Sequence, residues 1–349
     1  MNPNGYLSFS AVDLVARSHR RQTISNDDDD GDRRRFNFFF SRSSPVSLYL
    51  DRKRKVGNCT VYFGGKIVLG PRWHGFLISF ALYILIMTTV VLKILSVLDY
   101  GFLVIIVYLT GLCGLVLMLL TSLTNPGIIP RNDSGSLPAE TDPKSIDTTT
   151  GFLVPRYLLI NGVCVRQKFC RTCKIYRPPR SNHCSVCDNC VLKHDHHCIA
   201  LGTCVGLGNY RWFLLLCGNM CILLPAVFWL AKNQLFGIYY DNPDIAAQEF
   251  ILANAALIIV LVLSLVGFGA FALLFIYHYF ITSHNLTTNE HLKKYYKVNP
   301  FDYGTWVNLK HALFYPQALL PVDERLDVQA SYRELASTNS ECVSDFYDY

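Results

Sequence analysis

Asp195-His196-His197-Cys198 closes a cysteine- and histidine-rich stretch that decides what this chain can fold around. The stretch begins at Cys170 and ends at Cys204. Zinc takes four thiolate or imidazole ligands, and structural zinc sites use short pairs such as Cys-x2-Cys. If His196 and Cys198 are set aside, the remaining ligands suffice for two closed sites of three cysteines and one histidine each. These eight residues are Cys170, Cys173, His183, Cys184, Cys187, Cys190, His197 and Cys204.

Cys198 is the cysteine that the two predicted metal sites do not need. A closed structural site has no place for a ninth ligand. In an extended backbone, side chains two residues apart share a face, so His196 and Cys198 point together while His197 turns toward metal. An adjacent imidazole or a nearby metal lowers the pKa of a thiol from about 8.5. The pattern therefore predicts a cysteine nucleophile beside an imidazole.

The composition places this stretch in a membrane protein. Hydrophobic residues make up 51% of the 349 residues and charged residues only 17%, and the mean hydropathy of +0.25 is high for a soluble protein. Four apolar runs are long enough to cross a hydrocarbon core, which takes about 20 residues. They cover approximately residues 76–95, 102–123, 212–231 and 250–281. We predict an α-helical integral membrane protein of four transmembrane helices, with a two-zinc loop domain between the second and third.

Charge predicts the orientation of the four helices. Arg52-Lys53-Arg54-Lys55 precede the first run, and the segment 131–211 is rich in Lys and Arg, whereas the two other loops are not. The positive-inside rule then places both termini and the cysteine-rich stretch in the cytosol. Because the cytosol keeps thiols reduced, zinc is favoured over disulfides.

This orientation gives five predicted parts. They are a partly disordered cytosolic segment at 1–74, two helices in 75–124, a cytosolic linker and zinc domain at 125–211 with its core at 168–211, two helices in 212–281, and a cytosolic segment at 282–349.

The stretch resembles the cysteine-rich domain of the DHHC protein S-acyltransferases. The matching pattern is Cys170-x2-Cys173-x3-Arg177-Pro178-Pro179-Arg180-x2-His183-Cys184-x2-Cys187-x2-Cys190-x4-Asp195-His196-His197-Cys198-x5-Cys204. Three shorter stretches resemble the family's Asp-Pro-Gly, Thr-Thr-x-Glu and C-terminal motifs. These are Asn125-Pro126-Gly127, Thr287-Thr288-Asn289-Glu290 and Asn299-x-Phe301-x2-Gly304-x3-Asn308. The lead-in at 62–71 is similar to plant members, and the resemblance covers roughly residues 60–320.

The resemblance implies a two-step transfer of a long acyl group, such as palmitoyl, from acyl-CoA to cysteines of proteins. It implies that Cys198 is the nucleophile, His196 the general base and Asp195 the group that orients His196. It also implies one zinc bound by Cys170, Cys173, His183 and Cys190, and a second bound by Cys184, Cys187, His197 and Cys204. The expected partners are acyl-CoA, the lipid bilayer and cytosolic or membrane-associated proteins, with no nucleic acid. The expected compartment is the endomembrane system (Golgi, ER or vesicles) or the plasma membrane.

Five basic side chains are candidates for contact with the anionic CoA phosphates. They are Lys168, Arg177, Arg180, Lys193 and Arg211. For any one of them, a lipid-headgroup contact is an equal alternative.

The chain departs from the family pattern at three places. Ile199-Ala200 replace the usual Pro-Trp, Gly208 replaces an Arg, and Asn125 replaces the Asp of Asp-Pro-Gly. A Pro contributes rigidity and a Trp contributes packing, so a catalytically weak or inactive paralogue is one alternative.

Two further alternatives belong to other functional classes. A zinc-bearing membrane adaptor would leave Cys198 and His196 incidental, but such modules use longer gaps between ligand pairs. A transporter or channel is disfavoured because the apolar runs carry almost no ionisable residues beyond Lys93 and His278.

Overall fold

The computed structural model describes residues 54–95, 101–132 and 156–314. These residues fall into two compact units. Unit 1 contains the described residues 54–67, 127–132 and 156–193, and unit 2 contains 68–95, 101–126 and 194–314. The predicted linker and much of the two predicted terminal segments lie outside the described residues.

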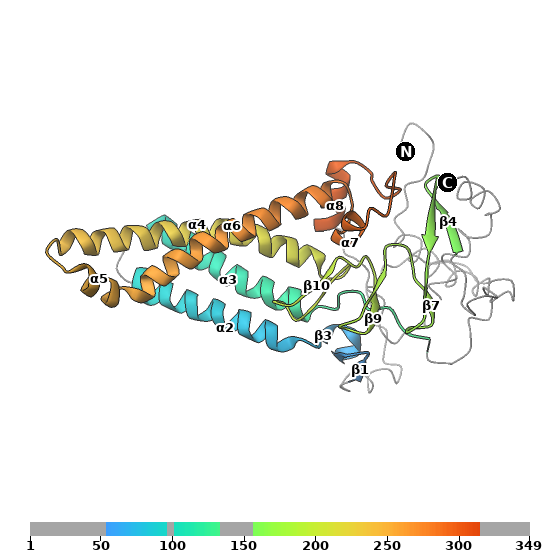
Figure 1. The fold of residues 1–349 in the computed structure, drawn as a ribbon, viewed down its shortest axis with the longest axis horizontal. Helices are drawn as coiled ribbons and strands as arrows, with labels where there is room; N and C mark the ends of the chain where they lie inside the picture. Colours follow the sequence, from blue (N-terminus) through green and yellow to red (C-terminus); the bar gives the residue numbers. More distant parts are fainter. Residues whose placement is uncertain (1–53, 96–100, 133–155, 315–349) are drawn as a thin grey trace, which may run out of the picture. The chain divides into compact units, whose positions relative to one another are not determined.

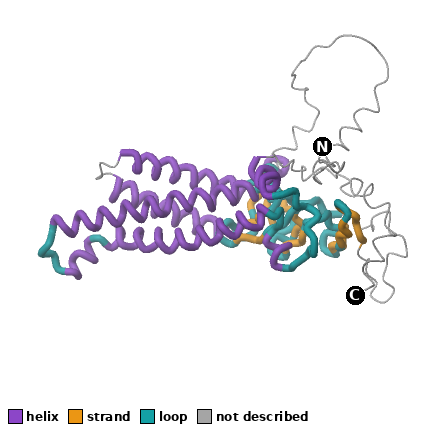
Figure 2. The backbone as a smooth tube through the Cα atoms, turned by 90° about the horizontal axis from the view of Figure 1, so that it is seen from above, coloured by secondary structure: helices purple, strands orange, loops and turns teal. Residues whose placement is uncertain are grey.

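Four long helices form the body of unit 2. They are α2 (Trp73–Val90), which continues into a π-helical turn η3 (Val91–Leu95), α3 (Gly101–Leu123), α4 (Tyr210–Asp241) and α6 (Ala255–Ser283). The helices lie side by side in both views (Figure 1, Figure 2). Within the described ranges, these four are the helices long and apolar enough to cross a membrane. The predicted helical membrane fold is therefore confirmed.

The bundle hides one apolar face of each helix and leaves another on the outside. Leu223, Leu230 and Val107 are almost completely buried, whereas Phe102 and Leu273 are more than 70% exposed. An apolar exterior is unfavourable in water but is what a helix needs in hydrocarbon.

Two helices differ in extent from the apolar runs of the sequence. The fourth run was expected to begin at residue 250, but residues there form a separate short helix, α5 (Ala247–Ala253). Asn254 leaves the helical region between α5 and α6, and its side-chain amide donates to the carbonyl of Phe250. The third run was expected to end at residue 231, but α4 continues to Asp241 and passes through Pro225 without ending.

Four short elements complete unit 2. The strands β10 (His196–Cys198) and β11 (Thr203–Val205) pair in antiparallel fashion. The helices α7 (Thr288–Leu292) and α8 (Thr305–Phe314) follow α6 and lie beside its C-terminal end (Figure 1). The chain thus returns to the strand that carries Cys198 after crossing the bundle.

Unit 1 consists of short strands. β1 (Arg54–Val56), β2 (Cys59–Tyr62) and β3 (Ile67–Leu69, which crosses the unit boundary) form one sheet, with a 3-10 turn η2 (Phe63–Gly65) before β3. The other strands form three hairpins. These are β4 (Arg156–Ile160) with β5 (Val163–Gln167), β6 (Phe169–Cys170) with β7 (Ile175–Tyr176), and β8 (Asn182–Cys184) with β9 (Asn189–Val191).

The hairpins that carry the cysteines have little apolar core of their own. One buried cluster consists mainly of Cys170, Cys173 and Cys190 with Ile129. Small domains of this kind need a metal or a disulfide to stay folded.

Candidate active site and metal centre

The strand β10 gives His196 and Cys198 a common face. Its backbone is extended, as predicted, and its partner β11 sets the register. His197 lies directly opposite Cys204 in that register. The alternation of the strand therefore separates the predicted nucleophile and base from the predicted metal ligand between them.

Asp195 holds the imidazole of His196 from the side away from Cys198. Asp195 is 2% exposed, and its carboxylate lies 2.7 Å from His196 Nδ1. The same carboxylate accepts the backbone N–H of Thr288 at 2.7 Å and its hydroxyl at 2.8 Å. Because Nδ1 is engaged by Asp195, Nε2 is the ring nitrogen left to bond the Cys198 thiol.

The half-buried Cys198 thiol has several neighbours that favour its thiolate form. Burial raises the pKa of Cys198, but the hydrogen bond and charge of His196 and the backbone N–H groups of Leu201 and Ala200 lower it below its usual value. Burial lowers the pKa of His196, but its bonds to Asp195 and Cys198 raise it to about 9. The pair thus favours a thiolate beside an imidazolium, the reactive form of a cysteine nucleophile.

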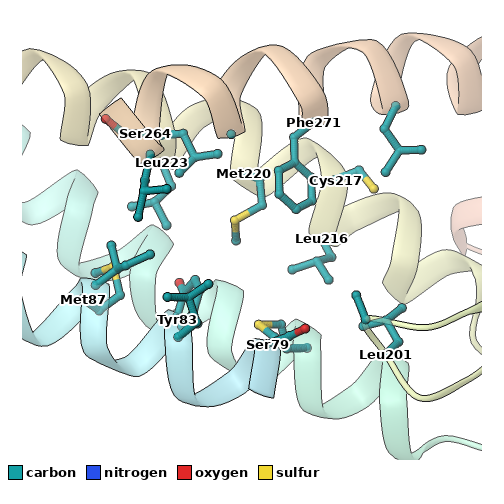
Figure 3. A pocket seen from close by; sticks show the side chains of 18 of the residues that line it. Ser79, Tyr83, Met87, Leu201, Leu216, Cys217, Met220, Leu223, Ser264 and Phe271 are labelled. Carbon is teal, nitrogen blue, oxygen red and sulfur yellow. The ribbon is translucent and has the colours of Figure 1, made fainter. Parts of the chain in front are cut away.

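An apolar cavity of about 400 Å³ lies next to Cys198. Figure 3 shows Leu201, Leu216 and Met220 among its lining side chains. Cys198, Ala200 and Leu201 line it on the strand side, and side chains from α2, α3, α4 and α6 line the rest. Its lining on α4 extends from Phe213 to Val227, about 21 Å along the helix axis. The cavity therefore has the length and the polarity for a long aliphatic chain rather than for a small polar molecule.

The loop after Cys198 is held by close backbone approach. Gly202 has a φ of +70°, and a side chain there would collide with the backbone of Arg72. A Cβ on Gly75, near the start of α2, would collide with the carbonyl oxygen of Ile199. The Ile199 side chain is 61% exposed. The backbone of this loop is therefore held against α2, whichever side chain residue 199 carries.

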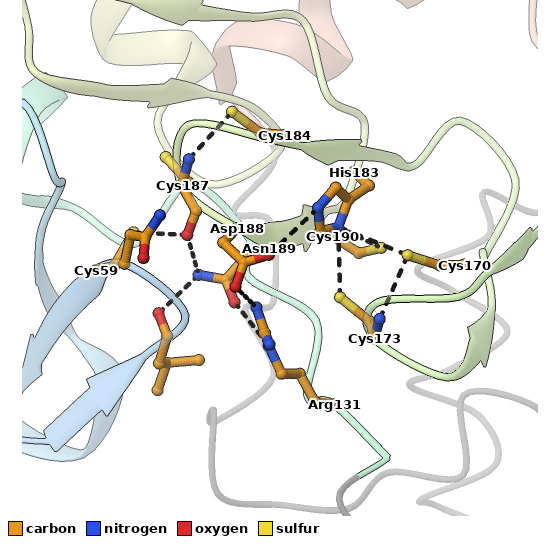
Figure 4. Close-up of polar contacts among 12 residues, drawn as sticks. Cys59, Arg131, Cys170, Cys173, His183, Cys184, Cys187, Asp188, Asn189 and Cys190 are labelled. Carbon is orange, nitrogen blue, oxygen red and sulfur yellow. Dashed lines mark hydrogen bonds and ion pairs between the residues drawn. The ribbon is translucent and has the colours of Figure 1, made fainter.

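In unit 1, one of the two predicted ligand sets is gathered at a single point (Figure 4). The four ligand atoms of Cys170, Cys173, His183 and Cys190 all lie within 4.8 Å of one another. His183 Nδ1 is 3.6, 3.5 and 3.9 Å from the sulfurs of Cys170, Cys173 and Cys190. Zinc bonds of about 2.0 and 2.3 Å in a tetrahedron put nitrogen and sulfur about 3.5 Å apart. The donor set and its spacing therefore fit zinc.

Charged side chains support this metal centre from outside. His183 Nε2 lies 3.5 Å from Asp188, and Asp188 lies 2.7 Å from the guanidinium of Arg131. A carboxylate on the far nitrogen of a metal-binding histidine fixes the ring orientation and strengthens the ligand. The Asn189 side chain also donates to the carbonyls of Val56 and Cys187, which ties β1 to this centre.

The second predicted ligand set is divided between the two units. In unit 1, the backbone N–H of Cys187 lies 3.4 Å from the Cys184 sulfur, the same local turn that Cys170 and Cys173 form. In unit 2, the Cys204 sulfur lies 3.6 Å from His197 Nδ1 and 3.7 Å from His194 Nε2. Each half thus has the local geometry of a ligand pair. Sequence reasoning did not consider His194, although it directly precedes Asp195.

The predicted CoA-binding residues are also divided between the units. Lys168, Arg177, Arg180 and Lys193 belong to unit 1, and Arg211 belongs to α4 of unit 2. The Arg177 guanidinium donates to Asn182 at 2.9 Å, and the Arg211 guanidinium lies 4.3 Å from the ring of Trp212. A shared role for the five in binding CoA stays a prediction.

Polar residues in two segments of unit 2 make hydrogen bonds that position the site. Thr287 and Glu290 form a reciprocal cap at the start of α7. Thr288, which follows Thr287, donates its backbone N–H to the carboxylate of Asp195. Asn209, which is fully buried, donates to the carbonyls of Thr121 and Cys204 and accepts the N–H of Gly206. The motif at 287–290 does not by itself predict the contact with Asp195, and local spacing does not predict the hydrogen bonds of Asn209 either.

The fold and the site together indicate a membrane enzyme with a cysteine nucleophile. Its Cys198, His196 and Asp195 lie beside a long apolar cavity that suits an acyl chain. Comparison with known proteins identifies the family. The DHHC palmitoyltransferase family model matches residues 164–295. Together with a relative that is 34% identical over 70% of its own length, this match shows that the chain belongs to the family, as its resemblance implied.

Relatives from plants and animals share the match. Probable protein S-acyltransferase 1 of Arabidopsis thaliana is 34% identical over 66% of this chain and 70% of its own length. Probable protein S-acyltransferase 5 of the same plant is 32% identical over 71% of this chain and 55% of its own length. Palmitoyltransferase ZDHHC14 of Homo sapiens is 33% identical over 61% of this chain and 46% of its own length. The chain thus spans about half the length of several curated relatives that it matches.

Proposed function

We propose that this protein transfers a long-chain acyl group, such as palmitoyl, from acyl-CoA to cysteines of other proteins through an acyl intermediate on Cys198. One observation carries the proposal: the thiol that is hydrogen-bonded to the His196–Asp195 pair also lines a long apolar cavity. The reactive atom and the space for an acyl tail thus occur at the same point.

In the first step, Cys198 forms the acyl-enzyme. His196 Nε2 takes the thiol proton, and the thiolate attacks the carbonyl carbon of the acyl-CoA thioester. The bond from the carbonyl carbon to the CoA sulfur breaks, and the CoA thiolate takes the proton back from His196. Asp195 keeps the ring oriented and stabilises its positive charge. The N–H groups of Ala200 and Leu201 stabilise the anionic sulfur of Cys198 before attack.

In the second step, an acceptor cysteine replaces CoA in the same arrangement. His196 takes the proton of the acceptor thiol, the new thiolate attacks the acyl-Cys198 carbonyl, and Cys198 leaves and is reprotonated. One thioester is exchanged for another, so the free energy changes little in either step. The protein accordingly has to position the reacting atoms rather than drive the reaction.

The cavity supplies the selectivity for a long chain. Each methylene that moves from water into apolar surroundings contributes about 0.8 kcal/mol. Because the cavity lining is formed by Leu216, Met220 and other apolar side chains of the bundle, an acyl tail gains this energy along its length. A short acyl group would leave most of the cavity unfilled.

Zinc acts in this proposal as structural support. Cys170, Cys173, His183 and Cys190 would hold one ion, and we retain the sequence prediction that Cys184, Cys187, His197 and Cys204 hold a second. The ions would cross-link hairpins that have little apolar core, and neither takes part in acyl transfer.

Substrates and surroundings belong to the same proposal. The CoA phosphates would meet some of Lys168, Arg177, Arg180, Lys193 and Arg211, and the acceptors would be cytosolic or membrane-associated proteins. Both termini would be cytosolic, in the endomembrane system or the plasma membrane, because acyl-CoA is a cytosolic substrate.

The test is labelling of the purified protein with radioactive palmitoyl-CoA. We expect a hydroxylamine-labile adduct in the wild type, loss of the adduct in Cys198→Ser, and an unchanged adduct in Cys217→Ser. Cys217 is a matched control because its thiol also lines the cavity but is not bonded to His196. An unlabelled wild type, or label that persists in Cys198→Ser, would refute the proposal.

A further inference from the structure

His278 is a buried imidazole beside the proposed active site that has no role in the reaction described above. It lies on α6 and is 2% exposed. An ionisable side chain within a membrane helix is unfavourable unless it is paired, and where one occurs it usually serves function. The contacts of His278 therefore decide what it does.

A buried tyrosine and threonine hold His278 from one side. The Tyr210 hydroxyl lies 3.1 Å from His278 Nδ1 and 2.8 Å from the Thr282 hydroxyl. If Thr282 donates to Tyr210 and Tyr210 donates to Nδ1, the Tyr210 hydroxyl both accepts and donates a hydrogen bond, and Nδ1 has a donor. The ring proton of His278 then sits on Nε2, the nitrogen away from Tyr210.

The other side of His278 faces the catalytic pair. A ring nitrogen of His278 lies within 4.8 Å of both a carboxylate oxygen of Asp195 and a ring nitrogen of His196. The centres of the two imidazole rings are 6.0 Å apart. Phe213 contacts both rings edge-on, with centroid distances of 5.3 Å to His196 and 4.8 Å to His278. The imidazole of His196 therefore packs against the ring of Phe213, and Phe213 in turn packs against His278.

We propose that His278, held by Tyr210, is a positioning residue that keeps the Asp195–His196 pair in the geometry that aims His196 Nε2 at Cys198. Thr288 fixes the Asp195 carboxylate by two direct hydrogen bonds, whereas His278 and Phe213 support the ring and its electrostatic surroundings. Without His278, the His196 ring can rotate away while its bond to Asp195 bends. The inference rests on the proposed acyl-transfer function.

The experiment measures acyl-enzyme formation from palmitoyl-CoA in single turnovers at several acyl-CoA concentrations. We expect His278→Leu to lower the maximal rate about 10- to 100-fold, since small misplacements of reacting groups have effects of that size. The acyl-CoA concentration for half-maximal rate should change less than about twofold, because the cavity is intact. His278→Gln should recover part of the rate, because its amide can bond Tyr210. Tyr210→Phe should show a smaller loss than His278→Leu.

Two controls separate positioning from folding and from metal binding. The same substitution at the exposed His284, six residues further along the chain, should leave the rate unchanged. Zinc content and melting temperature in detergent should match the wild type in His278→Gln and Tyr210→Phe.

Three results would overturn the inference while the wild type still forms the Cys198 adduct. The first is an unchanged rate in His278→Leu. The second is a rate loss that follows a loss of zinc, which would make His278 a metal ligand. The third is a loss that His278→Gln does not recover. A wild type without the adduct would instead refute the proposed function itself.

Discussion

Thr288 makes the two hydrogen bonds that fix the Asp195 carboxylate, and only one of them comes from its side chain. We expect Thr288→Val to lower the rate of Cys198 acylation about tenfold, because a hydrogen bond to a charged group contributes about 1.5 to 3 kcal/mol and the backbone bond remains. Thr288→Ser keeps the hydroxyl and should retain most of the rate. Rate measurement beside zinc analysis checks this. Equal rates in the valine and serine variants would contradict it.

Around Cys198, the sequence predicts the contacts between neighbouring residues but not those between distant ones. The alternation of His196, His197 and Cys198 was readable because it depends on neighbours in one strand. The contact from Thr288 to Asp195 joins residues 93 positions apart. Nothing in local spacing predicts such a contact, because it depends on how α6 and α7 return to the strand. In the sequence, His278 stands out only as an ionisable residue in an apolar run.

At the scale of elements, the loop after the nucleophile depends on glycine more than on Ile199 and Ala200. A Cβ on Gly75 would collide with the carbonyl oxygen of Ile199, whereas one on Gly269 would meet nothing within 4 Å. We expect Gly75→Ala to reduce acylation at least tenfold by displacing the loop, and Gly269→Ala to leave the rate within about twofold. Both glycines are in helices, so helix propensity is matched. A similar rate in the two variants would disprove the argument.

The hairpins of unit 1 give a prediction about metal. His183→Ala should lose one zinc per chain, and Asp188→Asn should keep the ion but bind it about 10- to 100-fold more weakly, because Asp188 supports His183 from outside. Metal analysis and competition with a chelator measure the two effects.

Cys59→Ser is the control for this metal prediction. Cys59 is buried, and its sulfur lies 4.0 Å from the carbonyl of Cys187, but it belongs to neither ligand set. Full zinc content in His183→Ala, or zinc loss in Cys59→Ser, would show that the ligands are assigned wrongly.

The helices were easier to predict in number than in extent. Length and apolarity identified the four long helices, because hydrocarbon thickness imposes both. The boundary at Asn254 was missed, because an apolar run does not reveal where a side-chain amide will interrupt it. The end of α4 was missed for the opposite reason, since polar residues such as Lys232 can continue a helix beyond the hydrocarbon region.

At the scale of the whole molecule, membrane orientation links the metal centres to the substrate. The segment between α3 and α4 carries every predicted catalytic residue and metal ligand, while the turn at 242–246 connects α4 to α5 without Lys or Arg. If the positive-inside rule holds, these two segments lie on opposite sides of the membrane. Acyl-CoA would then reach Cys198 directly from the cytosol.

Epitope tags test this orientation. A tag at either terminus, or between residues 143 and 155, should bind antibody in cells whose plasma membrane alone is permeabilised. A tag in the turn at 242–246 should bind only after all membranes are opened, or at the surface of intact cells if the protein resides in the plasma membrane. Each tagged protein should still label with palmitoyl-CoA, which shows that the tag has not disturbed the fold. Four spans place both termini on one side of the membrane and the 242–246 turn on the other side. If that turn is cytosolic in a protein that still labels, the termini lie on the opposite side, and the basic residues do not set the topology.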